Sequence, residues 1–248
     1  MTKLSVNVNK IALLRNARNG LIPNIVELSK KCIESGANGI TVHPRSDMRH
    51  IKPGDVKKLR KLTKDYSVEF NIEGNPFSNK EGKYPGFINL VETCLPEQCT
   101  LVPDDPNQLT SDHGWDLLRD SNKLKDVIKS LKDFGIRISL FLDPNIDQIN
   151  KAKELGADRI ELYTGPYAEE FSKKIELKRC LSLYKRSLEE ALNIGLQVNA
   201  GHDLNLKNLK TFLKIGSIKE VSIGHALISD SLIFGIEETV KLYVNECN

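Results

Sequence analysis

The stretch Gly39-Ile-Thr-Val-His-Pro-Arg-Ser-Asp-Met-Arg-His-Ile51 decides the fold that the sequence predicts. Its first four residues are small or β-branched, which is typical of a short buried strand. The strand ends at His43, and two arginines, an aspartate and a second histidine follow within seven residues. A parallel α/β sheet places its chemistry just past the C-terminal ends of its strands. Because arginine binds phosphate and histidine transfers protons near neutral pH, the stretch indicates acid–base catalysis on a phosphorylated substrate.

Outward from this stretch, strands and helices alternate along the chain. Apolar residues at helical spacing run from Ile25 to Ile33 before it and from Val56 to Leu62 after it. The eight expected strands are Leu4–Asn7, Gly39–Val42, Val68–Ile72, Cys99–Val102, Arg137–Leu142, Arg159–Tyr163, Gln197–Ala200 and Glu220–Ile223. Eight strand–helix units without a linker predict one α/β domain over residues 1–248, a (β/α)8 TIM barrel with extra helices.

The connections are predicted less sharply than the strands. We expect a polar loop from the first strand to Arg18, and a long loop over Pro103–Asp116. A helical stretch covers Tyr167–Ile194 and is long enough to break in two, a further helix lies near Leu204–Lys214, and one final helix opens at Gly224. An open doubly wound sheet is the alternative, but it usually has a glycine-rich phosphate loop after its first strand, and none is present here.

The composition excludes several classes of protein. A net charge of +3 is too small to indicate nucleic-acid binding, and no apolar run approaches the ~20 residues of a membrane span. The five cysteines are scattered, odd in number and without a C-x-x-C pair, so we expect them to be reduced packing residues. The sequence therefore predicts a cytoplasmic protein with no metal site, no nucleic-acid partner and no membrane partner.

Barrel closure would bring all the strand ends to one face. The residues at these ends are Asn7, His43, Glu73, Val102, Asp143, Thr164, His202 and Gly224. Four of the five histidines lie at or just after a strand end, which random placement would not often produce. This clustering is the strongest functional signal that the residues give by themselves.

Individual members of this set have competing interpretations. Asn7 either ends a strand or binds a ligand, and Arg18 and Arg45 either bind phosphate or form surface ion pairs. Glu73 is either a catalytic base or a partner for Arg45, and we favour the base. Asp143 is interpreted as a cap of the following helix.

Glycine precedes histidine at Gly201-His202 and again at Gly224-His225, each time between a strand and a helix. The loops after the seventh and eighth strands are the usual phosphate-binding loops of such barrels. Glycine lets backbone N–H groups approach an anion, and a helix N-terminus favours negative charge. Tight turns alone would also use glycine, but the repeated context favours phosphate binding.

Two other barrel chemistries fit the sequence less well. A metal-dependent hydrolase would be expected to carry His-x-His on its first strand, where this chain has Val6-Asn7-Val8. A lysine-dependent aldolase needs a lysine at a strand end, and Lys10 lies in the first loop instead. Imine chemistry would therefore have to use an amine of the substrate.

Seven segments, in order along nearly the whole chain, resemble the pyridoxine 5′-phosphate synthase family. They are Asn16-Ala-Arg18, Gly39-Ile-Thr-Val-His-Pro-Arg45, Arg49-His-Ile51, Asn71-Ile-Glu73, Leu101-Val-Pro103, Val198-Asn-Ala-Gly-His202 and Ile223-Gly-His225. The resemblance implies a (β/α)8 barrel with extra helices, an octameric assembly and a transferase that needs no cofactor. The implied reaction condenses 3-amino-2-oxopropyl phosphate with 1-deoxy-D-xylulose 5-phosphate, giving pyridoxine 5′-phosphate, phosphate and water.

The resemblance also implies roles for single residues. His43 and Glu73 would be proton acceptors and His202 a proton donor. The deoxyxylulose phosphate would be bound by Arg45, His50 and Thr110, and the aminoacetone phosphate end by Asn7, Arg18, Gly224 and His225. The long loop that carries Thr110 is interpreted as a lid over the site.

The chain departs from the family pattern at two places. Asn9-Lys10 stands where many members have Asp-His, and Asp203 stands where many have glycine. We expect the backbone N–H of Asp203 to face the substrate and its side chain to point away, because a carboxylate would repel phosphate. Two other functions remain open: a cofactor-free isomerase or lyase acting on another phosphorylated sugar, and a non-catalytic binder of phosphorylated ligands.

Overall fold

The computed structural model describes residues 1–18, 20–105, 107–119 and 121–248. Its strands form a closed parallel barrel in chain order, with the last strand paired to the first. The strands are β1 (Lys3–Asn7), β2 (Gly39–Val42), β3 (Glu69–Gly74), β4 (Gln98–Leu101), β5 (Arg137–Leu142), β6 (Arg159–Tyr163), β7 (Gln197–Gly201) and β8 (Glu220–Ile223). The predicted (β/α)8 fold is confirmed.

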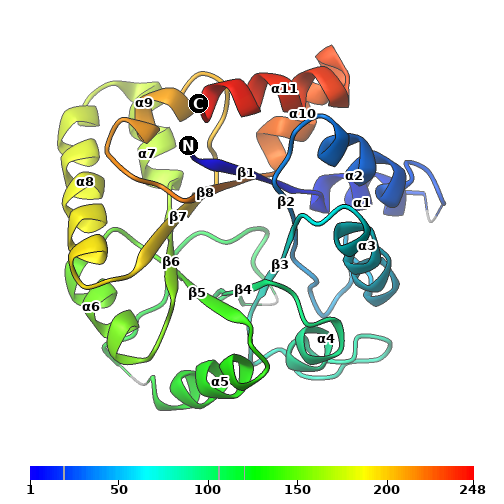
Figure 1. Cartoon of the computed structure of the whole chain (residues 1–248), viewed down its shortest axis with the longest axis horizontal. Coiled ribbons are helices and arrows are strands. Elements are labelled where there is room, and N and C mark those ends of the chain that lie inside the picture. The colour runs from blue at the N-terminus through cyan, green and yellow to red at the C-terminus, as the bar shows by residue number, and fades with distance from the viewer. Residues whose placement is uncertain (19, 106, 120) are drawn as a thin grey trace.

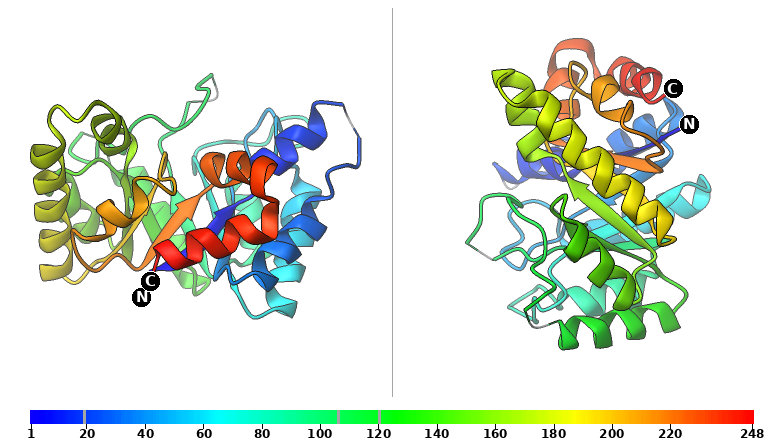
Figure 2. Two further views of the ribbon diagram at one scale, coloured as in Figure 1. Left: turned by 90° about the horizontal axis from the view of Figure 1, so that it is seen from above. Right: turned by 90° about the vertical axis from the view of Figure 1, so that its left-hand side faces the viewer.

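Helices cover the outside of the barrel, and the two chain termini lie side by side (Figures 1 and 2). The N–H of Thr2 donates to the carbonyl of Cys247 at 3.4 Å. The helices are α1 (Asn9–Asn16), α2 (Ile25–Glu34), α3 (Pro53–Asp65), α4 (Phe87–Cys94), α5 (Asn122–Asp133), α6 (Ile146–Glu154), α7 (Gly165–Lys173), α8 (Leu177–Asn193), α9 (Leu209–Leu213), α10 (His225–Phe234) and α11 (Ile236–Glu246).

Local sequence explains where α2 begins and ends. The side chain of Asn24 accepts hydrogen bonds from the N–H groups of Val26 at 3.1 Å and Glu27 at 3.3 Å. Such an N-cap typically contributes about 1 kcal/mol. Gly36 follows the helix with φ +108°, a conformation that glycine adopts without steric cost. The apolar face between these ends is buried against the barrel, as its spacing predicted.

Three connections differ from the sequence predictions. The expected polar loop after β1 is the helix α1, whose apolar Ile11 and Ala12 are buried; Asn7 Oδ1 accepts the N–H of Asn9, its first residue, at 3.1 Å. The final helix is two helices, α10 and α11, separated at Gly235 with φ +79°. The helix expected near Leu204–Lys214 is only the short α9.

The interior of the barrel is polar, which the sequence analysis did not anticipate. Bulky branched residues usually fill such barrels, and here these residues of β1 to β8 pack outward against the helices. The middle of the interior holds Ser5, Thr41, Asn71 and Thr100. Ser5 Oγ lies 2.7 Å from Thr41 Oγ1, and Thr100 Oγ1 donates to Asn71 Oδ1 at 3.1 Å. Polar residues can fill this space because they hydrogen-bond to one another from strand to strand.

Candidate active site

A pocket of about 370 Å³ opens at the C-terminal ends of the strands. Within the described part of the chain, ten of the eleven predicted site residues line it: Asn7, His43, Arg45, His50, Glu73, Thr110, His202, Asp203, Gly224 and His225. Arg18 is exposed just beyond α1 and is not among the lining residues. Barrel closure therefore brings together side chains that lie far apart in the sequence, while the role of Arg18 stays a prediction.

The His43 ring lies between two carboxylates at the end of β2. Its Nδ1 is 3.6 Å from Glu73 Oε1, and its Nε2 is 3.3 Å from Asp104 Oδ2. Glu73 Oε1 also accepts a hydrogen bond from Asn7 Nδ2 at 2.8 Å. The backbone N–H of His43 donates to Asn9 Oδ1 at 2.9 Å, so Asn9 has a defined structural contact. An imidazole beside a carboxylate, both largely buried, can pass protons to and from a substrate.

Asp104, which the sequence analysis missed, connects the loop after β4 to the site. Its carboxylate pairs with Arg45, and it accepts a hydrogen bond from Ser111 at 3.1 Å. Arg45 also donates to the carbonyl of Gln108 at 3.0 Å. The partner of Arg45 is therefore Asp104 and not Glu73. The position of Asp104 directly after the Leu101-Val-Pro103 segment was the available signal.

The loop after β4 has a second anchor at Trp115. The indole Nε1–H donates to the carbonyl of Leu101 at 2.9 Å. The ring meets Phe77 edge-on, with 6.1 Å between centroids. These contacts fix the far end of the loop whose near end is held by Asp104. Asp143 contacts the same loop, because it accepts the N–H of Gly114 at 3.0 Å. The prediction that Asp143 caps α6 is wrong, since Asn145 caps that helix.

His50 is buried behind His43, with 6.3 Å between the ring centroids. Burial lowers the pKa of His50 to about 2, and the neighbouring His43 and Arg45 act in the same direction. Its Nδ1 accepts the N–H of Ile51 at 2.9 Å. His50 is therefore a neutral ring with its proton on Nε2, which suits it to donate a hydrogen bond and not to exchange protons.

Glu161, in the middle of β6, is a site residue that the sequence analysis missed. It lines the floor of the pocket and is 4% exposed. Burial raises its pKa well above the ordinary 4.5, and the charges of Glu73 and Glu220 add to this rise. Burial therefore favours the protonated form of Glu161, which can donate a hydrogen bond. The alternation Arg159-Ile-Glu161-Leu-Tyr163 was the available signal, because a carboxyl group at period 2 between Arg159 and Tyr163 faces the interior.

The residues after β7 place His202 at the pocket wall. Its Nδ1 lies 2.8 Å from Asp203 Oδ2, its Nε2 lies 2.9 Å from Thr110 Oγ1, and its ring meets Tyr163 edge-on. The carboxylate of Asp203 contacts the His202 ring and the residue lines the pocket, while the expectation that its backbone N–H faces the substrate stays a prediction. The adjacent ring N–H offers the carboxylate a hydrogen-bond partner at the pocket wall.

Two glycines are closely packed at this end of the barrel. A Cβ on Gly201 would collide with Glu161 Oε1, and one on Gly224 would lie 3.1 Å from Asn7 Cβ. Gly224 immediately precedes α10, whose first residues His225 and Ala226 line the pocket. The N-terminus of α10 therefore faces the pocket, where its dipole favours an anionic group.

Several composition-based expectations can be compared with the structure. The cysteines are free thiols, and all except the half-buried Cys180 are buried. Within the described residues, no helix is both long and apolar enough to cross a membrane. Over the same residues, no group of three or more histidine, cysteine, aspartate or glutamate side chains is arranged to hold a metal ion. Lys10 lines the pocket, although the family motif would place an imidazole there.

A closed barrel with histidine and carboxylate side chains gathered in a pocket at the C-terminal ends of its strands is typical of (β/α)8 enzymes. The family model described as "Pyridoxal phosphate biosynthesis protein PdxJ" matches residues 4–248, and the chain belongs to this family. It is 51% identical over 245 residues to the pyridoxine 5′-phosphate synthase of Xanthomonas axonopodis pv. citri (strain 306), covering 98% of this chain and 96% of that protein. It is 48% identical to the enzyme of the same name from Xylella fastidiosa (strain M23), covering 98% of this chain and 94% of that protein.

Solved structures show the same architecture at low sequence identity. Thiamine phosphate pyrophosphorylase from Pyrococcus furiosus superposes with a TM-score of 0.62 at 15% identity, covering 99% of this chain and 95% of that chain. A chain of Mycobacterium tuberculosis tryptophan synthase superposes with a TM-score of 0.65 at 10% identity, covering 99% and 92%. At these identities the likeness shows the fold alone.

Proposed function

We propose that this chain is a pyridoxine 5′-phosphate synthase, a transferase that condenses 3-amino-2-oxopropyl phosphate with 1-deoxy-D-xylulose 5-phosphate. The products are pyridoxine 5′-phosphate, inorganic phosphate and water. Relatives with this name at about half identity over 98% of the chain support the reaction. The observation that carries the proposal is the convergence of His43, Glu73, Glu161 and His202 on one pocket.

The two sides of the pocket fit two phosphorylated substrates. Arg45, His50 and Thr110 would bind the deoxyxylulose phosphate on one side. Because Arg45 also binds Asp104 and Gln108 of the loop after β4, binding of this substrate is coupled to the position of that loop. Asn7 and the N-terminus of α10, at Gly224 and His225, would bind the aminoacetone phosphate on the other side.

The side chains present suit the chemistry without a cofactor. The amine of one substrate and the ketone of the other form the imine, with loss of water. Glu73 and His43 then accept protons from carbon as phosphate leaves and the ring closes. His202 donates a proton to an oxygen that leaves, and Glu161, which holds its proton, is a second donor. Each positioned acid or base typically contributes ~10²–10⁴-fold.

The test is to mix the purified protein with both substrates and to look for pyridoxine 5′-phosphate and inorganic phosphate. Each substrate alone serves as a control. We expect both products in equal amounts, and only when both substrates are present. Phosphate release from a single substrate would instead indicate a lyase acting on a phosphorylated sugar, and conversion of a single substrate to a product of the same mass would indicate an isomerase. Binding of both substrates without turnover would indicate a non-catalytic binder.

We also propose a cytoplasmic homo-octamer. Exposed apolar residues on α10 and before α2 support assembly: Leu232 is 80% exposed, Ile233 76%, and Leu21 and Ile22 more than 80%. Such side chains commonly mark interfaces between subunits. Free cysteines fit a reducing compartment. Light scattering coupled to size-exclusion chromatography tests the assembly, and a monomer would contradict it.

A further inference from the structure

The proposed reaction gives His202 a role as proton donor but gives none to the neighbouring Asp203, whose carboxylate contacts the His202 ring. Both nitrogens of the His202 ring have partners: Nδ1 meets Asp203 Oδ2 at 2.8 Å, and Nε2 meets Thr110 Oγ1 at 2.9 Å. A carboxylate on Nδ1 fixes the tautomer and the orientation of a ring whose Nε2 then faces the substrate. In this protein Nε2 of His202 faces Thr110, which lies in the loop after β4.

The backbone that carries the pair is held in place by neighbouring elements. Thr164, at the end of β6, donates to the carbonyls of Gly201, at 2.7 Å, and His202. Asn208 Nδ2 donates to the carbonyl of Asp203 at 3.1 Å. His202 has φ +86° and Asp203 has φ +59°, both in the left-handed region. Because these hydrogen bonds hold the backbone in this conformation, the side chains of His202 and Asp203 can contact each other.

The charges around the pair favour a carboxylate at position 203. The hydrogen bond from His202 lowers the pKa of Asp203 below its ordinary 3.8, against the opposing effect of burial, and His225 adds to the lowering. The other groups that face the ring are Thr110 in the loop after β4 and the edge of Tyr163 at the end of β6.

We propose that Asp203 is a positioning residue for His202. Its carboxylate holds the ring with a proton on Nδ1 and with Nε2 directed to Thr110 and the pocket, the orientation in which the ring acts in the proposed reaction. The inference rests on the proposed function for the identity of that reaction. The contact itself does not depend on turnover, so it can be tested separately.

Two substitutions remove the carboxylate while respecting the backbone. Asp203→Asn keeps the shape and tolerates a positive φ, and Asp203→Gly suits the left-handed conformation better than any other residue. Neither is expected to unfold the protein. Asp112→Asn is the matched control, because Asp112 is an exposed carboxylate on the neighbouring loop that binds His113 and Gln108 and does not line the pocket.

The first experiment determines the tautomer of the His202 ring by NMR, without substrates. In Asp203→Asn we expect the proton of the neutral ring to be distributed over both ring nitrogens, because the amide can donate as well as accept. Asp112→Asn should follow the wild type. An Asp203→Asn ring with the wild-type tautomer would overturn the inference.

The second experiment measures kcat and KM. We expect kcat to be reduced about 3–10-fold in both Asp203 variants, with KM unchanged within about 2-fold. An increase in KM with kcat unchanged would mean that Asp203 binds substrate and does not act through His202. Absence of pyridoxine 5′-phosphate from the wild type, with the change of tautomer present in Asp203→Asn, would refute the proposed function and leave the contact standing.

Discussion

The two ends of the barrel interior contain the same kinds of ionisable side chain and use them differently. At the C-terminal end, His43, Glu73 and His202 face a pocket that is open to ligands. At the N-terminal end, Glu69 pairs with Arg137, and Arg159 Nη1 donates to Gln98 at 3.0 Å. The difference lies in what the side chains face. At the N-terminal end they contact one another between strands, whereas at the C-terminal end they contact one another and also line the pocket.

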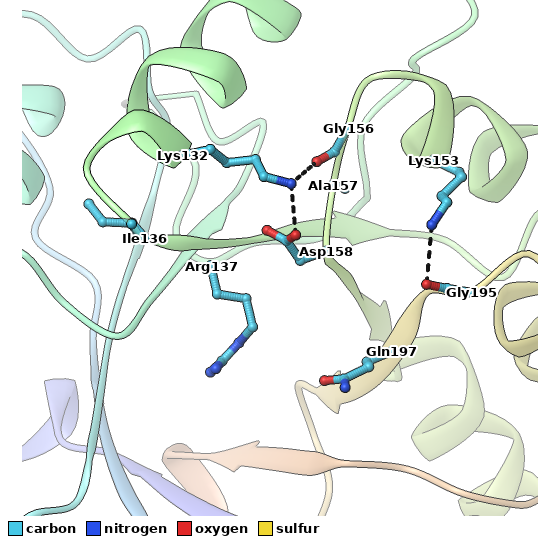
Figure 3. Close-up of a pocket in the computed structure, with 10 residues that line it drawn as sticks. Lys132, Ile136, Arg137, Lys153, Gly156, Ala157, Asp158, Gly195 and Gln197 are labelled. Carbon is cyan, nitrogen blue, oxygen red and sulfur yellow. Dashed lines mark hydrogen bonds and ion pairs between the residues drawn. The ribbon is translucent and has the colours of Figure 1, made fainter.

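The volume of a cavity does not indicate which end of the barrel holds the candidate active site. A cavity of about 630 Å³, larger than the candidate active site, lies beside the N-terminal ends of β5, β6 and β7 (Figure 3). Its lysines are engaged with backbone: Lys132 Nζ donates to the carbonyl of Gly156 at 2.9 Å and pairs with Asp158, and Lys153 donates to that of Gly195 at 3.2 Å. These lysines satisfy carbonyls at turns that follow helices, which is a structural role.

The largest expected effect concerns catalysis at the C-terminal end. Glu73→Gln and His43→Ala should each lower kcat by ~10²–10⁴-fold, because each removes a proton acceptor. Glutamine can still accept the Asn7 hydrogen bond, so thermal unfolding of Glu73→Gln should stay within a few degrees of the wild type. Steady-state assays and calorimetry measure both quantities. Glu189→Gln, an exposed change on α8, is the control, and normal turnover in both site variants would remove the proposed roles.

A substitution at the N-terminal end should instead lower stability and leave catalysis unchanged. Arg159→Met removes hydrogen bonds to Gln98 at 3.0 Å and Gln197 at 2.9 Å and leaves Arg137 as the remaining guanidinium beside the buried Glu69 and Glu220. We expect a loss of about 3–5 kcal/mol in the free energy of unfolding, with kcat of the folded enzyme unchanged. Urea unfolding measures the loss. Arg179→Met, at a guanidinium that is 87% exposed, should have almost no effect. Equal stability of the two variants would contradict the comparison.

The same end should make stability depend on pH through Glu220. Burial raises its pKa from 4.5 to about 8, the charge of Glu69 adds to the rise, and Arg159 opposes it. The folded protein therefore holds a proton that the unfolded chain releases near pH 4.5, so this contribution to stability is complete below pH 4.5 and is lost as the pH rises to about 8.

Glu220→Gln cannot ionise and should remove that dependence. We expect the free energy of unfolding of Glu220→Gln, taken relative to the wild type, to be larger at pH 8.5 than at pH 5 by on the order of 2–4 kcal/mol. Urea unfolding at both pH values measures this difference. A difference between the two proteins that does not change with pH would show that Glu220 titrates normally.

The smallest effect should come from the turns around the larger cavity. Lys132→Met removes an amine that binds Gly156 and Asp158 while keeping the apolar stem. Because the side chain is 39% exposed, we expect a loss below about 1 kcal/mol, or roughly 2–4 °C in Tm. Lys185→Met, a more exposed lysine on α8, is the control. A loss of several kcal/mol would mean that the contacts around this cavity contribute as much to the free energy of unfolding as those of Arg159.

The strands were predictable because runs of β-branched and aliphatic residues recur between glycines and polar turns. Barrel closure then predicted that His43, Glu73 and His202 would meet, since each ends a strand. Glu161 was missed because only strand ends were considered, and its side chain enters the pocket from the middle of β6. The contact of Asp104 depends on the path of a long loop, which residue spacing does not determine. The helix α1 was missed because its burial does not follow an amphipathic pattern: Leu13 and Leu14 are exposed, whereas Arg15 is buried.

Trp115, which anchors the loop after β4 beside Phe77, is the sole tryptophan of the chain. Its emission therefore has a single origin, and no label or engineered probe is needed to observe that loop. Stopped-flow fluorescence after mixing with either substrate would time the rearrangement of this segment, separately from the appearance of product.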